Sequence, residues 1–408
     1  MAPPSSDSEP AIVVIGGGHA GLLLALALEQ GGFSVTVVEP EPNDLVLTAP
    51  FDGRALALMH GSRMVFEALG LWPAIASIAE PIWAVRVEDR STGAAIVYDA
   101  REVGDQPFGY GIEHRMLRRR LLELVLTRPR IRLLAPARLQ ALTRSATQIE
   151  AVLEDGCRLR APLLVGADGR QSKLRALLRI GVDRWDYGQT AITFGIHHAR
   201  PHGHCVREFL RPAGPLALLP LGANLSAVTW VEPSTVAEDL LIAGNDSLAA
   251  ALAASLGDVP GRFELVGSAA GYPLSAHKAR RFVAPRVALV GDAAHGVHPI
   301  HAQGFNLGVR DVATLAELLV EARRTGLDPG GPETLLRYQR WRQSDARLVV
   351  NLTDGLNRLF SNDLPPLKLI RGLGLTALDR LAPLKHLAMR RGMGLAGNLP
   401  KLARGEAL

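Results

Sequence analysis

Three glycines and one carboxylate near the start of the chain have the spacing of a dinucleotide-binding turn. Gly16, Gly18 and Gly21 form a G-x-G-x-x-G pattern, and Glu39 follows Gly21 by eighteen positions. Such glycines permit a tight turn, the approach of a pyrophosphate to the backbone and close packing of a helix on a strand. A carboxylate at the position of Glu39 accepts hydrogen bonds from a ribose and repels a ribose 2′-phosphate. The pattern therefore predicts a site for FAD or NAD, and both remain open at this point.

Two aspartates further along the chain each follow a short apolar segment. Asp168 stands in the turn 165–170 (VGADGR), and Asp292 stands in the turn 290–295 (VGDAAH). Ligands of open α/β sheets collect at the carboxyl ends of strands, where we expect both aspartates to lie. A plain NAD fold has no use for an acid turn so far from the glycines. An extended cofactor with a polyhydroxyl chain does, because those hydroxyls need an acceptor far from the adenine.

Histidines recur in two places, and neither place predicts a metal site. His295, His298 and His301 stand at every third position, but Pro299 interrupts any helix that could align them and no cysteine or acid cluster joins them. We expect His295 to be a structural part of its turn and His301 to line a cavity. A second group stands near a predicted hairpin, in what we expect to be a solvated loop: His197, His198, His202 and His204.

The elements that must position these residues follow from the hydrophobic pattern. Residues 11–15 (AIVVI) predict a strand buried on both faces, the segment after the glycines predicts a helix, and residues 34–38 predict a second strand. Further segments predict short apolar strands at 163–165 and 287–290, a helix at 115–126, antiparallel strands within 82–98 and 190–231, and mostly helix after 303.

Composition places the chain among folded globular proteins. It has 408 residues, of which 48% are hydrophobic and 21% charged, which suggests two to three domains. Its two cysteines, Cys157 and Cys205, exclude a disulfide framework and favour a reducing compartment. No uncharged apolar run reaches the length of a spanning helix, and residues 1–10 predict a short disordered lead rather than a signal peptide.

The basic charge is concentrated at the C-terminal end. The net charge is +5, and residues 366–408 carry eight basic residues against two acidic ones. The remainder is therefore close to neutral, and with 5% aromatic residues a nucleic-acid binder is a poor interpretation. Basic and apolar residues interleave in this tail, as they do in helices that lie on an anionic bilayer. A helix packed on the body, with a solvated basic face, explains the pattern equally well.

The three turns, in this order and spacing, resemble those of the class A FAD-dependent aromatic hydroxylases with the para-hydroxybenzoate hydroxylase fold, and within them the ubiquinone-biosynthesis hydroxylases. The resemblance extends from about residue 10 to the end of the chain. Its supporting segments are 52–58 (DGRALAL), 69–72 (LGLW), 214–221 (GPLALLPL), 291–295 (GDAAH), 303–311 (QGFNLGVRD), 354–356 (DGL) and 359–362 (LFSN).

The resemblance implies an α/β fold with a Rossmann-like FAD-binding domain, an inserted antiparallel-sheet substrate domain and a C-terminal helical region. The FAD-binding domain would be discontinuous, and the last region would face a membrane. The expected bounds are 11–80, 110–182 and 275–350 for the FAD-binding domain, 81–109 and 183–274 for the substrate domain, and 351–408 for the C-terminal region.

The resemblance also implies roles for single residues. Glu39 would bind the adenosine ribose, and Asp292 would bind the ribityl chain. Arg54, with Arg115 or Arg118, would lie near the pyrophosphate, and Asp168 would lie between the FAD site and a transient NADPH groove. The flavin ring would lie beside the catalytic residues Pro299, His301 and Gln303 and the loop residues Gly304, Phe305 and Asn306. Candidates for the apolar cavity wall are Phe209, Leu216, Leu218 and Leu219, although each of them suits an ordinary sheet core as well.

The implied activity is an NAD(P)H-consuming FAD monooxygenase. It would hydroxylate the aromatic ring of a polyprenylated ubiquinone precursor with O₂ through a flavin hydroperoxide, as a cytoplasmic protein peripheral to the inner face of the membrane and possibly within a biosynthetic complex. The alternatives are a hydroxylase of a soluble aromatic compound, a non-catalytic quinone or lipid binder, and a flavin-linked reductase of prenyl double bonds. One departure stands out, since Ala302 replaces the glycine that the family usually has before Gln303. Alanine is harmless there only if its φ is negative.

Overall fold

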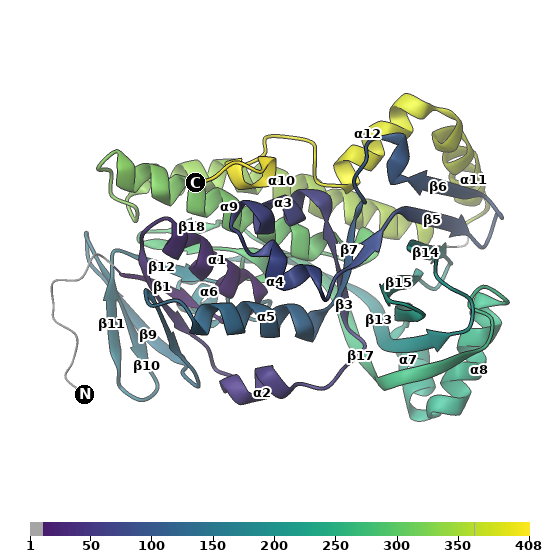
Figure 1. The fold of residues 1–408 in the computed structure, drawn as a ribbon, viewed down its shortest axis with the longest axis horizontal. Coiled ribbons are helices and arrows are strands. Elements are labelled where there is room, and N and C mark those ends of the chain that lie inside the picture. The colour runs from purple at the N-terminus through teal and green to yellow at the C-terminus, as the bar shows by residue number, and fades with distance from the viewer. Residues whose placement is uncertain (1–10, 363) are drawn as a thin grey trace.

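The computed structural model describes residues 11–362 and 364–408, and its base is a parallel sheet wound with helices (Figure 1). The expected lead at 1–10 lies outside the described residues. In spatial order the strands of this sheet are β18 (Val283–Ala284), β19 (Val287–Leu289), β12 (Leu163–Gly166), β1 (Ala11–Ile15), β2 (Ser34–Val38) and β8 (Ile131–Leu134). All neighbours pair in parallel except β18 with β19.

Helices and a small antiparallel sheet cover the central strands of this sheet, which explains why the strands are continuous apolar runs. Ile12 and Val14 on β1 are fully buried. The covering helices include α1 (His19–Gln30), α5 (His114–Leu126) and α9 (Gln303–Arg324). A three-stranded sheet of β9 (Leu139–Arg144), β10 (Ile149–Leu153) and β11 (Arg158–Ala161) extends from one end of the molecule (Figure 1).

A second, mostly antiparallel sheet of eight strands forms the other half of the molecule. Its strands in spatial order are β20 (His295–Gly296), β17 (Phe263–Ala279), β13 (Val182–His198), β16 (Leu225–Pro233), β15 (Leu216–Gly222), β14 (Cys205–Leu210), β5 (Ala84–Asp89) and β6 (Ala95–Asp99). Two helices, α7 (Ser234–Ile242) and α8 (Asn245–Leu256), pack with the buried side chains on one of its faces. The other face packs against the loop before α9 and the C-terminal helices.

A small sheet joins the two halves. It consists of β3 (Ala55–Met59), β7 (Gly109–Glu113) and β4 (Glu80–Ile82), and the helices near it are α2 (Asn43–Thr48), α3 (His60–Ala68) and α4 (Trp72–Ala76).

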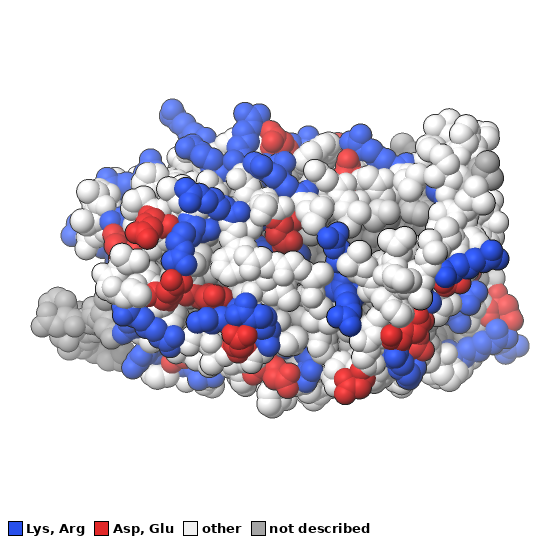
Figure 2. All heavy atoms as spheres, turned by 90° about the horizontal axis from the view of Figure 1, so that it is seen from above, with Lys and Arg blue, Asp and Glu red and all other residues white. Residues whose placement is uncertain are grey.

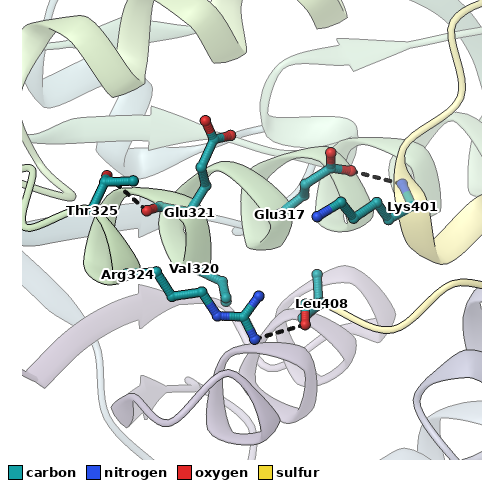
Figure 3. A pocket seen from close by; sticks show the side chains of 7 residues that line it. All are labelled: Glu317, Val320, Glu321, Arg324, Thr325, Lys401 and Leu408. Carbon is teal, nitrogen blue, oxygen red and sulfur yellow. Dashed lines mark hydrogen bonds between the residues drawn. The ribbon is translucent and has the colours of Figure 1, made fainter.

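The C-terminal part of the chain is helical, with α10 (Pro332–Phe360), α11 (Pro365–Arg380) and α12 (Ala382–Gly392). Helix α10 runs unbroken through position 350, where the domain boundary is expected. The last residues return to α9, where the backbone N–H of Lys401 donates to Glu317 and Arg324 donates to the carbonyl oxygen of Leu408 (Figure 3). None of the described helices has an apolar stretch long enough to cross a bilayer.

The expected fold class, an α/β sheet with a second sheet and a helical C-terminal region, is therefore confirmed.

Candidate functional site

The glycine turn between β1 and α1 has the shape of a phosphate cradle. Gly16 has a φ of +106°, and a Cβ atom there would lie 2.4 Å from the carbonyl oxygen of Ala167. A Cβ atom at Gly21 would lie 1.9 Å from the carbonyl oxygen of Gly16, so only glycine allows this packing. Over Gly18 nothing lies within 4 Å of that position. No side chain caps α1 and no acid stands in its first turn, so its free N–H groups and positive dipole end face open space.

Glu39 and Arg118 meet beside this turn. The buried Glu39 carboxylate accepts the backbone N–H groups of Gly17 and Glu41, and it lies 3.2 Å from a guanidinium nitrogen of Arg118. Arg118 also donates to the carbonyl oxygen of Gly17. Arg115 points elsewhere, because it donates to the carbonyl oxygen of Ala49 at 2.8 Å. Of the two arginines, the structure thus brings Arg118 to the glycine turn.

Arg54 lies on the side of the cradle nearer to the second sheet. It forms an ion pair with Asp52 and lies over the ring of Tyr272. The pKa of His19 is lowered to about 4, chiefly by burial and also by the charges of Arg118 and Arg54, against a backbone hydrogen bond that raises it. His19, the first residue of α1, is therefore neutral at physiological pH between two permanent cations.

The second acid turn, at 290–295, lies close to the glycine turn although the two are far apart in the sequence. It forms the short helix η2 (Gly291–Ala293), which packs against α9, and α9 packs against α1. The rings of His19 and Phe305 are 5.6 Å apart, so the N-terminal ends of α1 and α9 are neighbours. The carboxylate of Asp292 is 43% exposed and lies 3.2 Å from Arg170. This leaves Asp292 open to a ligand.

A buried ion network fixes this turn. Asp311 on α9 accepts hydrogen bonds from the backbone N–H of Gly291 at 2.9 Å, from His295 at 2.6 Å and from Arg342 at 2.8 Å. Burial raises the pKa of Asp311, but the charges of His295 and Arg342 outweigh it and hold that pKa below its usual value. His295 is thus a structural part of the turn, as expected.

Asp168 and Arg170 in the first acid turn have different surroundings. One oxygen of Asp168 accepts the N–H of Leu174 in α6 (Lys173–Leu177), and its other oxygen is buried without a hydrogen-bond partner among the described residues. Arg170 donates to Asp292 and to the carbonyl oxygens of Ser275 and Val297. Arg170 therefore ties the two acid turns to the loop that precedes α9.

The loop of Pro299, His301 and Gln303 runs between the two sheets. Pro299 precedes the short helix η3 (Ile300–Ala302), and His301 and Ala302 have φ values of +62° and +50°. Ala302 thus occupies the conformation in which alanine, unlike glycine, is strained. Helix α9 begins at Gln303, where the chain is expected to become mostly helical.

The amides of this loop hold it to other elements. The Asn306 side chain donates to the carbonyl oxygen of Ala57 and accepts the N–H of Met59, both on β3. The Gln303 side chain donates to the carbonyl oxygen of Gly392 in α12. Gly304 lies in the first turn of α9, next to Val297.

Three of the four candidates for the cavity wall belong to the sheet core instead. Phe209, Leu216 and Leu218 pack with α7 and α8 on the face away from the loop, and only Leu219 lies on the loop side, near Ala302. Sequence alone could not assign the face, because alternation along a strand does not say which face meets which partner.

The sequence gives little indication of a buried acid beside this loop. Glu208 on β14 is buried, and its carboxylate lies 3.7 Å from Nδ1 of His301. The available signal was an acid that alternates with Val206 and Leu210 along one strand.

Of the histidines near the hairpin, His197 and His204 are exposed, as expected, but His198 is not. His198 is buried and contacts Ser226 and the carbonyl oxygen of Arg200. Ligand atoms of Glu80, His202 and His204 lie within 4.8 Å of one another. However, Nδ1 of His202 accepts the backbone N–H of His204. The other ring nitrogen of His202 then carries the proton in the neutral ring, which is the wrong tautomer for a metal ligand there.

Comparisons with known proteins agree with this geometry. A family model of the FAD binding domain matches residues 9–353. The chain is 42% identical over 407 residues to ubiquinone hydroxylase UbiL of Rhodospirillum rubrum, with 99% of this chain and 95% of that protein covered. It is 35% identical over 388 residues to 3-demethoxyubiquinol 3-hydroxylase of Escherichia coli, with 94% and 98% covered. The solved structure of p-nitrophenol 4-monooxygenase PnpA from Pseudomonas putida has the same fold, with a TM-score of 0.79 at 19% identity, over 96% of this chain and 100% of that one.

Proposed function

The chain belongs to the FAD binding domain family, and on this premise we propose that it hydroxylates the aromatic ring of a polyprenylated ubiquinone precursor. It is an FAD-dependent monooxygenase, with NAD(P)H as reductant and O₂ as oxidant. The observation that carries the proposed substrate is the likeness to two ubiquinone-pathway hydroxylases over almost the whole chain.

The shape of the cradle fits FAD, and each polar group beside it has a matching part of the cofactor. The free N–H groups of α1 and the cation of Arg118 face the place of a pyrophosphate. Glu39 stands where a ribose hydroxyl would donate, and the half-exposed Asp292 is free to accept from the ribityl chain. The flavin ring of FAD would then lie beside Gly304, Phe305 and Asn306, at the positive end of the α9 dipole.

Bound FAD supplies the redox chemistry and the activation of oxygen. The protein must bind the cofactor, exclude water and orient the substrate ring. We assign the orientation to the loop of Pro299, His301 and Gln303, because it lies between the two sheets and is held by hydrogen bonds to β3 and α12. Asp168 accepts the N–H of Leu174 and Arg170 donates to Asp292, so both residues stabilise the turns beside the cradle. We assign the groove next to them to the transient nicotinamide cofactor.

We further propose that α11 and α12 lie on the surface of an anionic membrane, on its cytoplasmic side, where a hydrophobic substrate is available. Figure 2 shows the molecule from above, and the surface over these helices, at the upper right, is largely uncharged. Exposed apolar side chains lie on and between them: Ile370, Leu373, Leu381, Leu384 and Leu387. Arg380, Arg390 and Arg391 are available for lipid headgroups, while the buried Arg371 and Lys385 hold the helices to the body. Membership of a biosynthetic complex is compatible with this placement.

Oxygen consumption tests the proposed activity. Purified protein with FAD and NADPH should take up O₂ faster when a polyprenylated phenol is added, and ring-hydroxylated product should accumulate with NADPH oxidation. A product with a reduced prenyl chain and no O₂ uptake would indicate a reductase instead. A protein that binds no FAD and does not oxidise NADPH would be a non-catalytic binder.

A further inference from the structure

A carboxylate is buried where the substrate sheet faces the loop before α9. Glu208 lies near the middle of β14, and its side chain is 8% exposed. Its only basic neighbour within 4.0 Å in the described part of the chain is His301, at 3.7 Å, and no described side chain donates a hydrogen bond to it. His301 is 40% exposed, so it connects the buried carboxylate to solvent.

The alternation of β14 aims Glu208 at this loop. Val206 and Leu210, two positions away on either side, belong to apolar clusters that also contain Ala302 and Ile300 of the loop, respectively. Phe209 points the other way, into the core under α7 and α8. A one-residue shift of register would therefore have removed the carboxylate from the loop side.

The surroundings of Glu208 are otherwise apolar. Val206, Leu210, Ile300 and side chains of α11 and α12 form two small apolar clusters there. Tyr98 on β6 belongs to both clusters. Burial, with the charges of Glu208 and Asp379, raises the pKa of Tyr98 to about 12. The Tyr98 hydroxyl therefore keeps its proton at physiological pH.

A buried carboxyl group to which no described side chain donates a hydrogen bond costs folding free energy, so its presence calls for a use. The fold offers one, because the loop that meets Glu208 is the one that we assign to the substrate ring. Attack of an electrophilic oxygen on a phenol ring withdraws electrons from the phenol oxygen, so the O–H becomes strongly acidic as the new C–O bond forms. A nearby base that takes this proton lowers the barrier.

We propose that Glu208 is the catalytic base that accepts the ring hydroxyl proton of a phenolic substrate, and that His301 passes this proton to solvent. This inference rests on the proposed function. The phenol O–H bond breaks as oxygen is transferred, and its electron pair stays in the ring system. The proton moves to a Glu208 oxygen, then through His301 to water, and the carboxylate is restored. No oxidant is needed beyond the O₂ and NAD(P)H of the reaction.

The test compares a polyprenylated phenol with its methyl ether, which has no proton to give, in the FAD-loaded protein. The wild type should hydroxylate the phenol roughly 100-fold faster than the ether, the scale of general base catalysis. In Glu208→Gln the rate on the phenol should fall to that on the ether. FAD content should be unchanged, as should the dissociation constant of the phenol within about threefold. NADPH oxidation should continue with release of peroxide, because binding and reduction do not need the base.

Glu88→Gln is the matched control. Glu88 lies on the adjacent strand β5, and its register partner is Phe209, so it faces away from the loop. This variant should keep the wild-type preference for the phenol. Equal wild-type rates on phenol and ether, or a Glu208→Gln protein that keeps the preference, would overturn the role of Glu208. Absence of product from either compound in the wild type would instead refute the proposed function.

Discussion

Ala302 shows how one residue in the catalytic loop bears backbone strain. Its φ of +50° lies in the left-handed region, where a Cβ atom costs roughly 1–2 kcal/mol.

Ala302→Gly should therefore raise the free energy of unfolding by about 1 kcal/mol, measured by urea denaturation. Ala294→Gly is the control, because Ala294 is buried with a φ of −94° and should lose stability on the same change. A loss of stability in both variants would refute the strain at position 302.

A substitution of Asp292 tests whether this residue binds the ribityl chain of FAD. Asp292→Ala should weaken FAD binding by roughly 1–3 kcal/mol, because a buried hydroxyl of the cofactor loses its acceptor. The readout is the dissociation constant from quenching of FAD fluorescence. Asp183→Ala is closely matched, since Asp183 is also 43% exposed and also pairs with an arginine, on β13. Equal FAD affinity in both variants would remove Asp292 from the site.

At the scale of elements, the buried Asp311 joins α9, α10 and the second acid turn. Asp311→Ala should lower the free energy of unfolding by about 3–5 kcal/mol, because it leaves His295 and Arg342 buried without their partner. Asp258→Ala breaks an exposed pair with Arg200 and should cost less than about 1 kcal/mol. Urea unfolding of both variants measures the contrast, and similar losses would contradict it.

The exposed leucines of α11 and α12 test the membrane surface. The double variant Leu373→Glu and Leu384→Glu should partition into anionic vesicles at least roughly tenfold less than wild type in a flotation assay. FAD content should not change. Leu126→Glu, on the exposed side of α5, should float like the wild type. Equal flotation of all three proteins would argue for helices that are only packed on the body.

Elements with a local signal could be predicted, and those that depend on distant partners could not. The strand 11–15, the helix after it and the strand 34–38 appear as β1, α1 and β2, because buried parallel strands and apolar helices are readable from short windows. The two acid turns could be predicted to lie at one cradle, because both follow parallel strands, whose carboxyl ends share one edge of the sheet. In contrast, the buried places of Arg371, Lys385 and Glu208 depend on contacts with β5, η1 (Ala100–Glu102) and the loop at 299–303, which no local pattern carries.

At the scale of the whole molecule, several buried histidines link stability to pH. Burial lowers the pKa of His19, His277 and His298 to about 4. In the unfolded chain the pKa of histidine is about 6.5, so below that pH the unfolded state binds protons that the folded state does not. Their contribution to stability is therefore complete above pH 6.5 and is lost as the pH falls toward 4.

The fully buried His298 alone should lower the free energy of unfolding by roughly 2 kcal/mol at pH 5 relative to pH 7.5. Urea unfolding between these pH values measures the slope, and His298→Gln should make it shallower. A stability that is constant or rises on acidification would contradict the assignment of neutral buried histidines.

The most direct test of ring hydroxylation traces an oxygen atom from O₂ into the product. The purified protein is supplied with FAD, NADPH, a polyprenylated phenol and ¹⁸O₂, and the product is analysed by mass spectrometry. We predict one ¹⁸O atom on the aromatic ring for each product molecule, at a yield that follows NADPH oxidation. A ring hydroxyl without the label would contradict the claim that the protein is a flavin-dependent ring hydroxylase. NADPH oxidation that yields only peroxide with each polyprenylated phenol tested would contradict it as well.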